Sequence, residues 1–310
     1  MTDTILFSDW AVQWLESIHG TIKENTYEAT YRNSVFNHLI PYFGNRYIDS
    51  IKPIELQIFL NQSANRFSVD TVKKFKSCLK QIFDDAVYNG YCEKNPCYKL
   101  KTPHNQYTDT IEEDNNIYTP EQMFLIEDFA FKHRFGLDIL LLLETGMRRG
   151  EMLGLPWENV DLNNKAIYIK QALALIKENN TLVAKIGPPK NKSSNRVIPI
   201  STDFTAYLAN QKKLSSSEYV IHNKENGIIN PRTWQRRHYD VFMSDLQKEY
   251  VDMPVLNPHR LRHSKASKWV NEGLNLYAIA KALGHSDLNM LKKRYAHSDL
   301  EEVRKLLNLK

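Results

Sequence analysis

The chain has 310 residues, 42% of them hydrophobic, with 41 basic and 36 acidic side chains, an ordinary composition for a protein of two domains. No apolar run is long enough to cross a bilayer, because the best candidate, 137–143, is far too short, and no secretion signal begins the chain. The three cysteines are an odd number without paired metal-ligand spacing, so we expect reduced thiols in a cytoplasmic protein with no membrane partner.

The first hundred residues have the apolar spacing of an all-helical bundle. Between two of the helices, Pro41 and Gly44 break the pattern, so 38–51 is predicted to be a connector. The predicted helices are 5–19, a segment that starts at Asn25-Thr26, one that Pro53 opens, and one from Ser68 to about Asn89.

Two of these helices have informative side-chain patterns. In the helix after Pro53, the apolar positions are Ile54, Ile58 and Leu60. In the helix after Ser68, the buried stripe is predicted to be Val72, Phe75, Leu79, Ile82, Phe83 and Ala86. Four lysines lie largely off that stripe, and they form either a solvated face or contacts to DNA phosphates: Lys73, Lys74, Lys76 and Lys80.

A polar segment without periodicity, 101–118, is predicted to link two domains. It carries Lys101 against four acidic residues, a balance of −3. Residues 1–100 hold 11 basic and 11 acidic side chains, whereas 119–310 hold 29 and 21. The positive charge of the chain, +5 overall, therefore lies in its C-terminal part, where it favours a nucleic-acid partner.

The second domain is predicted to combine helices with a few short strands. Thr119 caps its first helix, Pro120 takes the first helical position, and 137–143 forms a buried helix. Gly146 then turns the chain, and Arg148 opens a helix that runs through Leu155. The predicted β structure is a strand over 165–171, a hairpin over 176–183, and a second hairpin around 191–195 that leads into 196–200.

The most informative stretch is 257–297, which concentrates reactive side chains. Asn257 is predicted to cap a helix that has Pro258 in the first helical position. His259 and Arg262 are then three residues apart and share one face of that helix.

The following helix is predicted to end at Gly284, and His285 comes directly after it. Ser286 can cap the next helix, which presents Tyr295. A cation, two imidazoles and a phenol brought together indicate a site for an anion that a tyrosine attacks.

These residues belong to a set of motifs in a fixed order. TG-x-R-x-G-E occupies 145–151, PPKNKSSNRVIPI occupies 188–200, HRLRH begins at His259, and LGH is followed ten residues later by a tyrosine. In this order and spacing the motifs resemble those of the tyrosine recombinase (phage integrase) family, and the resemblance covers nearly the whole chain. The matching arginine of the first motif is Arg148, and the matching hairpin lysine of the second is Lys190.

The resemblance implies an enzyme that cuts and rejoins DNA through a 3′-phosphotyrosine formed by Tyr295. Arg148 and Arg262 would bracket the phosphate, because each planar guanidinium donates two hydrogen bonds and keeps its charge. Glu151, one helical turn from Arg148, would orient that arginine or a nearby imidazole.

Three further side chains would donate hydrogen bonds or transfer protons in this reaction. His285 would donate to the phosphate, Lys190 would protonate the leaving 5′ oxygen, and His259 would act as general acid–base. The bond energy stays in the phosphotyrosine ester, so neither ATP, a metal nor another cofactor is implied.

Several assignments have rivals in the sequence. Arg149 is adjacent to Arg148 but is expected at the surface, and Lys192 competes with Lys190 because hairpin registers slip. His259 and His263 have a zinc-binding spacing, although no third ligand of matching type is evident nearby. A basic cluster either contacts the DNA backbone or is a solvated face: Arg236, Arg237 and His238.

The function implied by the resemblance is integration or excision of a mobile element, since the body of the chain resembles integrases of phages and conjugative transposons. The alternatives are an Xer-like resolvase of chromosome or plasmid dimers, a non-catalytic DNA-binding relative, and a type IB topoisomerase. Larger integrases carry an additional N-terminal arm-binding domain, so we expect either a simple two-domain recombinase or a fragment.

The expected fold is mainly α with a small β-sheet: a helical, SAM-like core-binding domain over 1–100, the linker 101–118, and an α+β catalytic domain over 119–297. The tail 298–310 has a capping box and an apolar stripe, so it is predicted to be a short amphipathic helix. The resemblance implies that this tail docks in a neighbouring protomer. The implied partners are double-stranded DNA, a homotetramer on paired sites and accessory DNA-bending proteins.

Overall fold

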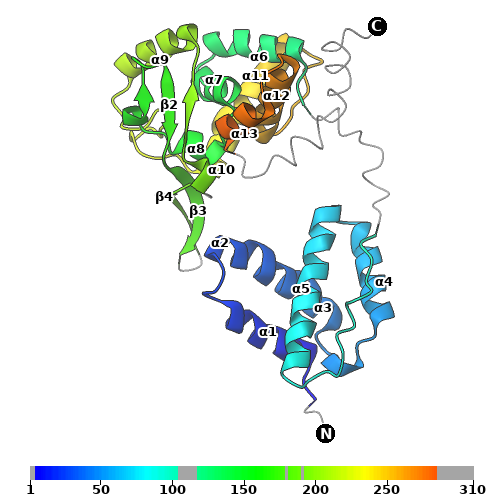
Figure 1. Ribbon diagram of the computed structural model, residues 1–310. Helices are drawn as coiled ribbons and strands as arrows, with labels where there is room; N and C mark the ends of the chain where they lie inside the picture. The colour runs from blue at the N-terminus through cyan, green and yellow to red at the C-terminus, as the bar shows by residue number, and fades with distance from the viewer. Residues whose placement is uncertain (1–3, 104–116, 179–180, 190–191, 285–310) are drawn as a thin grey trace. The chain divides into compact units, whose positions relative to one another are not determined.

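The computed structural model describes residues 4–103, 117–178, 181–189 and 192–284, and the chain divides into two compact units, 1–113 and 114–310 (Figure 1). Each unit has its own hydrophobic core. Within the described ranges, no helix is both long enough and apolar enough to cross a membrane. The predicted fold class, mainly helical with small sheets, is confirmed.

The named secondary-structure elements of unit 1 are all helical, and its described residues after α5 (Val69–Tyr88), which are 89–103, form turns and irregular chain. Helices α1 (Phe7–Ile18) and α5 meet the expectations from sequence, because apolar residues at helical spacing form their buried faces. The helical segments are α1 (Phe7–Ile18), α2 (Glu24–Thr26), the π-helical η1 (Tyr27–Arg32) and η2 (Val35–Leu39), α3 (Ile40–Phe43), the 3-10 turn η3 (Ile48–Ser50), α4 (Pro53–Ala64) and α5 (Val69–Tyr88).

Helix α5 begins and buries its side chains as predicted. The Ser68 hydroxyl accepts a hydrogen bond from the backbone N–H of Thr71, which satisfies a donor that the first turn leaves unpaired. All six predicted stripe residues are buried against the core of unit 1. Lys73, Lys74 and Lys80 are exposed on the other side, and Lys76 is half-buried.

Two predictions for unit 1 are wrong. The connector predicted over 38–51 is helical up to Phe43, because Pro41 occupies an early position of α3, where its missing N–H breaks no bond of that helix. In α4, Ile54 and Ile58 are exposed, whereas Leu60 is buried together with Leu56 and Phe59. The aromatic ring of Phe59, which packs against Phe43 and Phe75, decides which apolar face turns inward.

Unit 2 packs helices around a central buried helix, α7, with two small sheets to one side (Figure 1). The Thr119 cap and Pro120 start its first helix as predicted. Its helices are α6 (Pro120–Lys132), α7 (Gly136–Thr145), α8 (Arg149–Leu153), α9 (Thr202–Leu214), α10 (Pro231–Trp234), the π-helical η7 (Gln235–Tyr239), α11 (Asp240–Glu249), α12 (Pro258–Asn271) and α13 (Leu276–Leu283).

The strands of unit 2 form two antiparallel sheets, ordered β1-β2-β5 and β3-β4. The predicted hairpin over 176–183 is present at the end of the β3–β4 ribbon, where Ile176 pairs with Val183 and Glu178 pairs with Thr181. The strands are β1 (Val160–Asp161), β2 (Ala166–Ile169), β3 (Ala172–Glu178), β4 (Thr181–Gly187) and β5 (Arg196–Pro199), with 3-10 turns at η5 (Trp157–Asn159) and η6 (Lys192–Ser194).

The second predicted hairpin, around 191–195, is wrong. Strand β5 pairs with β2 in the other sheet rather than with β4, and the 3-10 turn η6 leads into it. Strand β5 runs antiparallel to β2 over four residue pairs, from Ala166 with Pro199 to Ile169 with Arg196, and this pairing makes β2 the central strand of its sheet. The segment before β5 therefore crosses from one sheet to the other.

Candidate active site

The motif 145–151 forms the junction between α7 and α8. Gly146 adopts φ +60°, a left-handed conformation that ends α7, and a Cβ there would lie 2.8 Å from the Leu283 side chain. Gly150 lies so close to β3 that a Cβ would lie 2.5 Å from the Leu173 carbonyl oxygen. Both glycines are thus required by close packing, which places the Arg148–Glu151 segment between α13 and β3.

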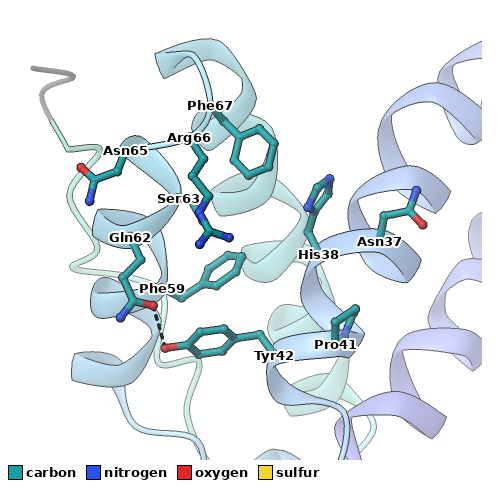
Figure 2. A pocket seen from close by; sticks show the side chains of 10 residues that line it. All are labelled: Asn37, His38, Pro41, Tyr42, Phe59, Gln62, Ser63, Asn65, Arg66 and Phe67. Atoms are coloured by element: carbon teal, nitrogen blue, oxygen red, sulfur yellow. Dashed lines mark hydrogen bonds between the residues drawn. The ribbon is translucent and has the colours of Figure 1, made fainter. Parts of the chain in front are cut away.

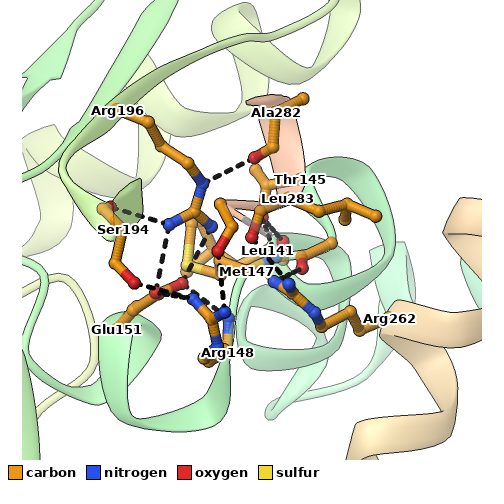
Figure 3. A network of polar contacts seen from close by, with 12 residues as sticks. Leu141, Thr145, Met147, Arg148, Glu151, Ser194, Arg196, Arg262, Ala282 and Leu283 are labelled. Atoms are coloured by element: carbon orange, nitrogen blue, oxygen red, sulfur yellow. Dashed lines mark hydrogen bonds and ion pairs between the residues drawn. The ribbon is translucent and has the colours of Figure 1, made fainter. Parts of the chain in front are cut away.

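Glu151 is the centre of the polar network that follows (Figure 3). Its carboxylate accepts hydrogen bonds from the backbone N–H of Arg148 at 2.8 Å and from Arg148 Nη1 at 2.8 Å. It also accepts bidentate hydrogen bonds from the guanidinium of Arg196, from Nη1 at 3.0 Å and from Nη2 at 2.9 Å. The expected contact between Glu151 and Arg148 is therefore present, and a second arginine shares the same carboxylate.

The three arginines of this network all donate to the C-terminal end of α13 (Figure 3). Arg196 Nε donates to the Ala282 carbonyl at 2.6 Å, and Arg262 Nη2 donates to the Leu283 carbonyl at 2.6 Å. Arg148 Nη2 donates to the Gly284 carbonyl at 2.9 Å. Three consecutive carbonyl groups, immediately before His285 in the sequence, are thus bound by three guanidinium groups.

The burial of this cluster leaves it with excess positive charge. Glu151 and Arg262 are each 2% exposed and Arg196 is 6% exposed, so water screens them little. Among the described residues of the network, one carboxylate faces three guanidinium groups, an excess of two positive charges. A buried cluster with this excess of positive charge favours an anion as its partner.

The pKa values of the cluster reflect the same imbalance. Burial alone would raise the pKa of Glu151, but the hydrogen bonds and charges of Arg196 and Arg148 outweigh it and hold that pKa below its ordinary value. Burial, reinforced by the charge of Arg148, lowers the pKa of Arg262 to about 9, which still leaves the guanidinium charged at neutral pH. Glu151 is therefore an anion and its arginine partners are cations.

His259 lies at the start of α12, where Asn257 caps the helix as predicted by accepting the His259 backbone N–H at 3.0 Å. The side chain of His259 is exposed toward a cavity of about 470 Å³. Partial desolvation, with the charges of Arg262 and Arg148, lowers the pKa of His259. The cavity is lined by Met147, Arg148, Arg149, Gly150, Gln235, Asn257, Pro258 and His259.

The predicted site residues divide into those that the structure describes and those that it does not. Arg148, Glu151, His259 and Arg262 all lie in this region of unit 2. Arg149 is exposed, as expected, and donates to Gln235 across the cavity wall at 3.2 Å. The predicted residues outside the described ranges are Lys190, His285 and Tyr295, together with the tail 298–310.

The basic cluster at η7 is only partly exposed. Arg236 and Arg237 are exposed, but His238 is half-buried, with its ring Nδ1 2.8 Å from an Asp138 carboxylate oxygen that also accepts the Trp234 indole N–H. His238 therefore anchors η7 to α7 and does not extend the basic surface. Among the described residues, no group of three potential ligands could hold a metal ion.

Unit 1 contains a cavity of about 770 Å³ beside α4, shown in Figure 2. Aromatic rings of Tyr42, Phe59 and Phe67 line it, and the Tyr42 hydroxyl donates to Gln62 at 3.3 Å. His38 sits between the rings of Phe67 and Phe75, and burial lowers its pKa. None of the motif residues that the structure describes lines this cavity.

Sequence reasoning missed Arg196. It lies in the quoted stretch PPKNKSSNRVIPI, as the first residue of a strand, where a charged residue ordinarily faces solvent. The available signal was that the other residues of β5 are apolar or Pro, so an arginine there, directly after the lysine motif, needs a buried partner. Burial of Arg196 on Glu151 could not be predicted without knowing that β5 pairs with β2.

The fold and the site together define a class: a helical unit joined to an α+β unit in which residues of four motifs meet in a buried cationic cluster. Comparison with known families specifies it further. The profile of the phage integrase family matches residues 105–302, and that of the phage integrase central domain matches residues 7–103. The chain therefore belongs to the phage integrase family, the tyrosine recombinases that its motifs resemble.

Individual relatives agree with this assignment. A tyrosine recombinase XerC-like protein of Caldanaerobacter subterraneus subsp. tengcongensis is 29% identical over 294 residues, which cover 87% of this chain and 73% of that protein. The transposase of transposon Tn916 from Enterococcus faecalis is 28% identical over 282 residues, which cover 84% of this chain and 66% of that protein. The chain thus spans about two thirds to three quarters of these relatives.

Solved structures show the same fold. The Tn1549 transposon integrase in complex with transposon right end DNA matches with a TM-score of 0.80 and 20% identity, over 98% of this chain and 99% of that chain. A lambda integrase dimer bound to a COC' core site matches with a TM-score of 0.69 and 16% identity, over 94% of this chain and 77% of that chain.

Proposed function

We propose that this chain cuts and rejoins double-stranded DNA at specific sites through a 3′-phosphotyrosine, and that it integrates or excises a mobile element. One observation carries the proposal. Arg148 and Arg262, from two motifs far apart in the sequence, donate to adjacent carbonyl groups, those of Gly284 and Leu283, directly before His285. Three of the family's motifs thereby meet at one cationic site.

The charge of the cluster suits the proposed transition state. Attack of a phenolate on a phosphodiester gives a phosphorane with two negative charges, and the described network has two positive charges in excess. Preorganised donors of this kind stabilise charge that develops in the transition state. In the proposed step the Tyr295 oxygen bonds to phosphorus, the bond to the 5′ oxygen breaks, and the phosphate stays esterified to the enzyme.

Proton transfers in this step are assigned to residues around the cluster. His259, held neutral at physiological pH by its lowered pKa, would accept the phenolic proton of Tyr295. Lys190 would protonate the leaving 5′ oxygen, and His285 would donate a hydrogen bond to the phosphate. Rejoining reverses these transfers, so the exchange of one ester for another needs no ATP.

Further parts of the proposal concern how the protein holds DNA. Unit 1 would act as the core-binding domain, with the exposed lysines of α5 on phosphates, and Arg236 and Arg237 would contact the backbone from unit 2. Tetramers on paired sites, linked by the tail 298–310 docking in trans, would perform strand exchange with accessory DNA-bending proteins.

The experiment is to trap the covalent complex. The full chain is incubated with a library of nicked suicide duplexes, and DNA that stays bound in SDS is sequenced. Tyr295→Phe is expected to bind DNA normally but give no adduct, because only the nucleophilic hydroxyl is lost. Tyr277→Phe is the matched control, since Tyr277 is an exposed tyrosine of α13, and it should give wild-type adduct.

The trapped sequences also decide between candidate functions. Ends of a mobile element support integration or excision, whereas a site for resolving chromosome or plasmid dimers would support the Xer-like alternative, which the XerC-like relative favours. An adduct that persists in Tyr295→Phe would place the nucleophile elsewhere, and a wild-type protein that binds DNA without any adduct would identify a non-catalytic relative.

A further inference from the structure

We infer that Arg196 is a positioning residue of the proposed cleavage reaction: it fixes Arg148 through Glu151 and Ser194, and it ties β5 to the end of α13 that precedes His285. The expected effect on cleavage rests on the proposed function, whereas the contacts of Arg196 do not depend on it. Arg196 does not belong to the set of motif residues to which sequence reasoning assigned roles.

Arg196 is placed to hold other residues and not to hold DNA. Its side chain is 2% exposed, and four hydrogen bonds engage its guanidinium: two to Glu151, one to the Ser194 carbonyl and one to the Ala282 carbonyl. A guanidinium has five N–H groups, so these bonds use most of its donor capacity. A phosphate could reach it only by displacing protein partners.

Both residues that hold Arg148 Nη1 are themselves held by Arg196. Arg148 Nη1 donates to Glu151 at 2.8 Å and to the Ser194 hydroxyl at 3.2 Å. Arg196 donates to that same carboxylate and to the Ser194 carbonyl at 3.0 Å. Arg196 therefore fixes the two groups that orient Arg148, a residue that lines the cavity and is partly exposed there, whereas Arg196 is not among the residues that line it.

Gly284 supplies an independent sign that Arg196 and the end of α13 are fitted to each other. Gly284 has φ +67°, and a Cβ there would lie 3.1 Å from both Cδ and Nη1 of Arg196. A side chain at position 284 would thus be strained by the backbone and would press on the Arg196 guanidinium. Because Gly284, the glycine of the LGH motif, has no side chain, Arg196 can pack directly against its backbone.

The test uses the pH profile of cleavage by the full chain, at saturating concentrations of the trapped DNA site. Glu151 faces Arg148 and Arg196 directly and Arg262 at longer range. Arg196→Met removes the main group that holds the Glu151 pKa down, so the acid limb of the rate profile should move to higher pH. In Arg196→Met/Glu151→Gln the titrating carboxyl is gone, and that movement should disappear.

Arg196→Lys separates charge from geometry and remains informative if Arg196→Met does not fold. An ammonium can pair with Glu151 but cannot also donate to Ala282, because it lacks the planar fork and the Nε donor. The pH profile should stay like the wild type, while the cleavage rate at saturating DNA falls about 10²-fold, the effect of a small misplacement of reacting groups. Binding of the DNA site should be unchanged.

Arg46→Met is the matched control, because Arg46 also pairs with a glutamate, Glu55, and with a backbone carbonyl, that of Ser50, but lies in unit 1. It should leave both the rate and the pH profile as in the wild type. Wild-type cleavage by Arg196→Lys, or an acid-limb movement that persists in the double variant, would overturn the positioning role.

A readout without DNA distinguishes failure of this inference from failure of the proposed function. ¹³C NMR of glutamate carboxyl groups should show one carboxyl, lost in Glu151→Gln, whose pKa is below its ordinary value and rises in Arg196→Met. If that resonance does not move, Arg196 does not control Glu151. If it moves and the wild type never forms an adduct, the inference about positioning holds while the proposed cleavage function fails.

Discussion

Replacing Glu151 by Gln tests whether one buried carboxylate holds the arginine cluster together. Each carboxylate oxygen accepts two N–H groups, one from Arg148 and one from Arg196. Glutamine keeps the shape but turns one oxygen into an NH₂ group, which then faces two donors. The variant therefore loses the charge and two hydrogen bonds at once, and three guanidinium groups remain without a carboxylate.

The expected cost follows from this geometry. Removing one partner of a buried ion pair typically costs about 3–5 kcal/mol, because the remaining charge is left uncompensated. Urea unfolding at pH 7 measures it: with a slope of about 3 kcal/mol/M for a unit of this size, the midpoint should fall by roughly 1 to 1.7 M. Unit 2 should show this change, and unit 1 should unfold as before.

The pH dependence checks that the charge is responsible. The Glu151 pKa is lower in the folded than in the unfolded state, so its stabilisation is complete above the ordinary value of 4.5 and is lost as pH falls through the folded value. The difference between wild type and Glu151→Gln should therefore be constant near neutrality and narrow below about pH 4.5.

The matched control is Asp128→Asn, which removes an exposed ion pair to Lys132 on α6 and should change the midpoint little. A Glu151→Gln protein with a near-wild-type midpoint would show that the arginines are held by the α13 carbonyl groups alone. A difference between Glu151→Gln and wild type that stays constant down to pH 3 would show that the lost stability comes from packing and not from charge.

Three other experiments have definite expected outcomes. Gly150→Ala should lower the free energy of unfolding by about 1–3 kcal/mol in thermal melts, because the added methyl group would clash with the Leu173 carbonyl oxygen. Gly187→Ala is the control and should leave that free energy unchanged, because a Cβ there meets nothing within 4 Å. NMR titration of His259 in the free protein should give a pKa below 6.5; a value above 6.5 would contradict the lowering, and a value above 7 would contradict a neutral base at pH 7. Removing 298–310 should spare binding to one DNA site but abolish paired-site assembly in native gel shifts, and recombination by the truncated protein would refute docking in trans.

Helix starts and the β3–β4 hairpin of this chain follow from local sequence signals, whereas the pairing of β5 does not. Ser68 and Asn257 cap their helices because a side-chain oxygen beside the first turn satisfies its N–H groups wherever the helix packs. The partner of β5 is β2, a strand 30 residues earlier in the sequence, and no local pattern encodes that pairing. The predicted hairpin around 191–195 fails for that reason.

The site shows the same division. The contact between Arg148 and Glu151 could be predicted because the two residues are one helical turn apart. The pairing of Arg196 with Glu151 depends on β5 lying against α8 and α13, so it could not be predicted from spacing. The burial of two residues predicted to share one helix face also differs: His259 is exposed, whereas Arg262 is buried. Arg262 is buried because its guanidinium donates to the carbonyl groups of Gly146 and Leu283.

The end of α13 is, by itself, an unfavourable place to bring a phosphate. The last carbonyl groups of a helix carry about half a negative charge and would repel an anion. Here three consecutive carbonyl groups are each bound by an arginine, so this end presents positive charge instead. The same guanidinium groups that neutralise the helix end would also form the proposed phosphate site. We therefore expect a shift of α13 to move Arg148 and Arg262 with it, which would couple the placement of the residue after Gly284 to the strength of phosphate binding.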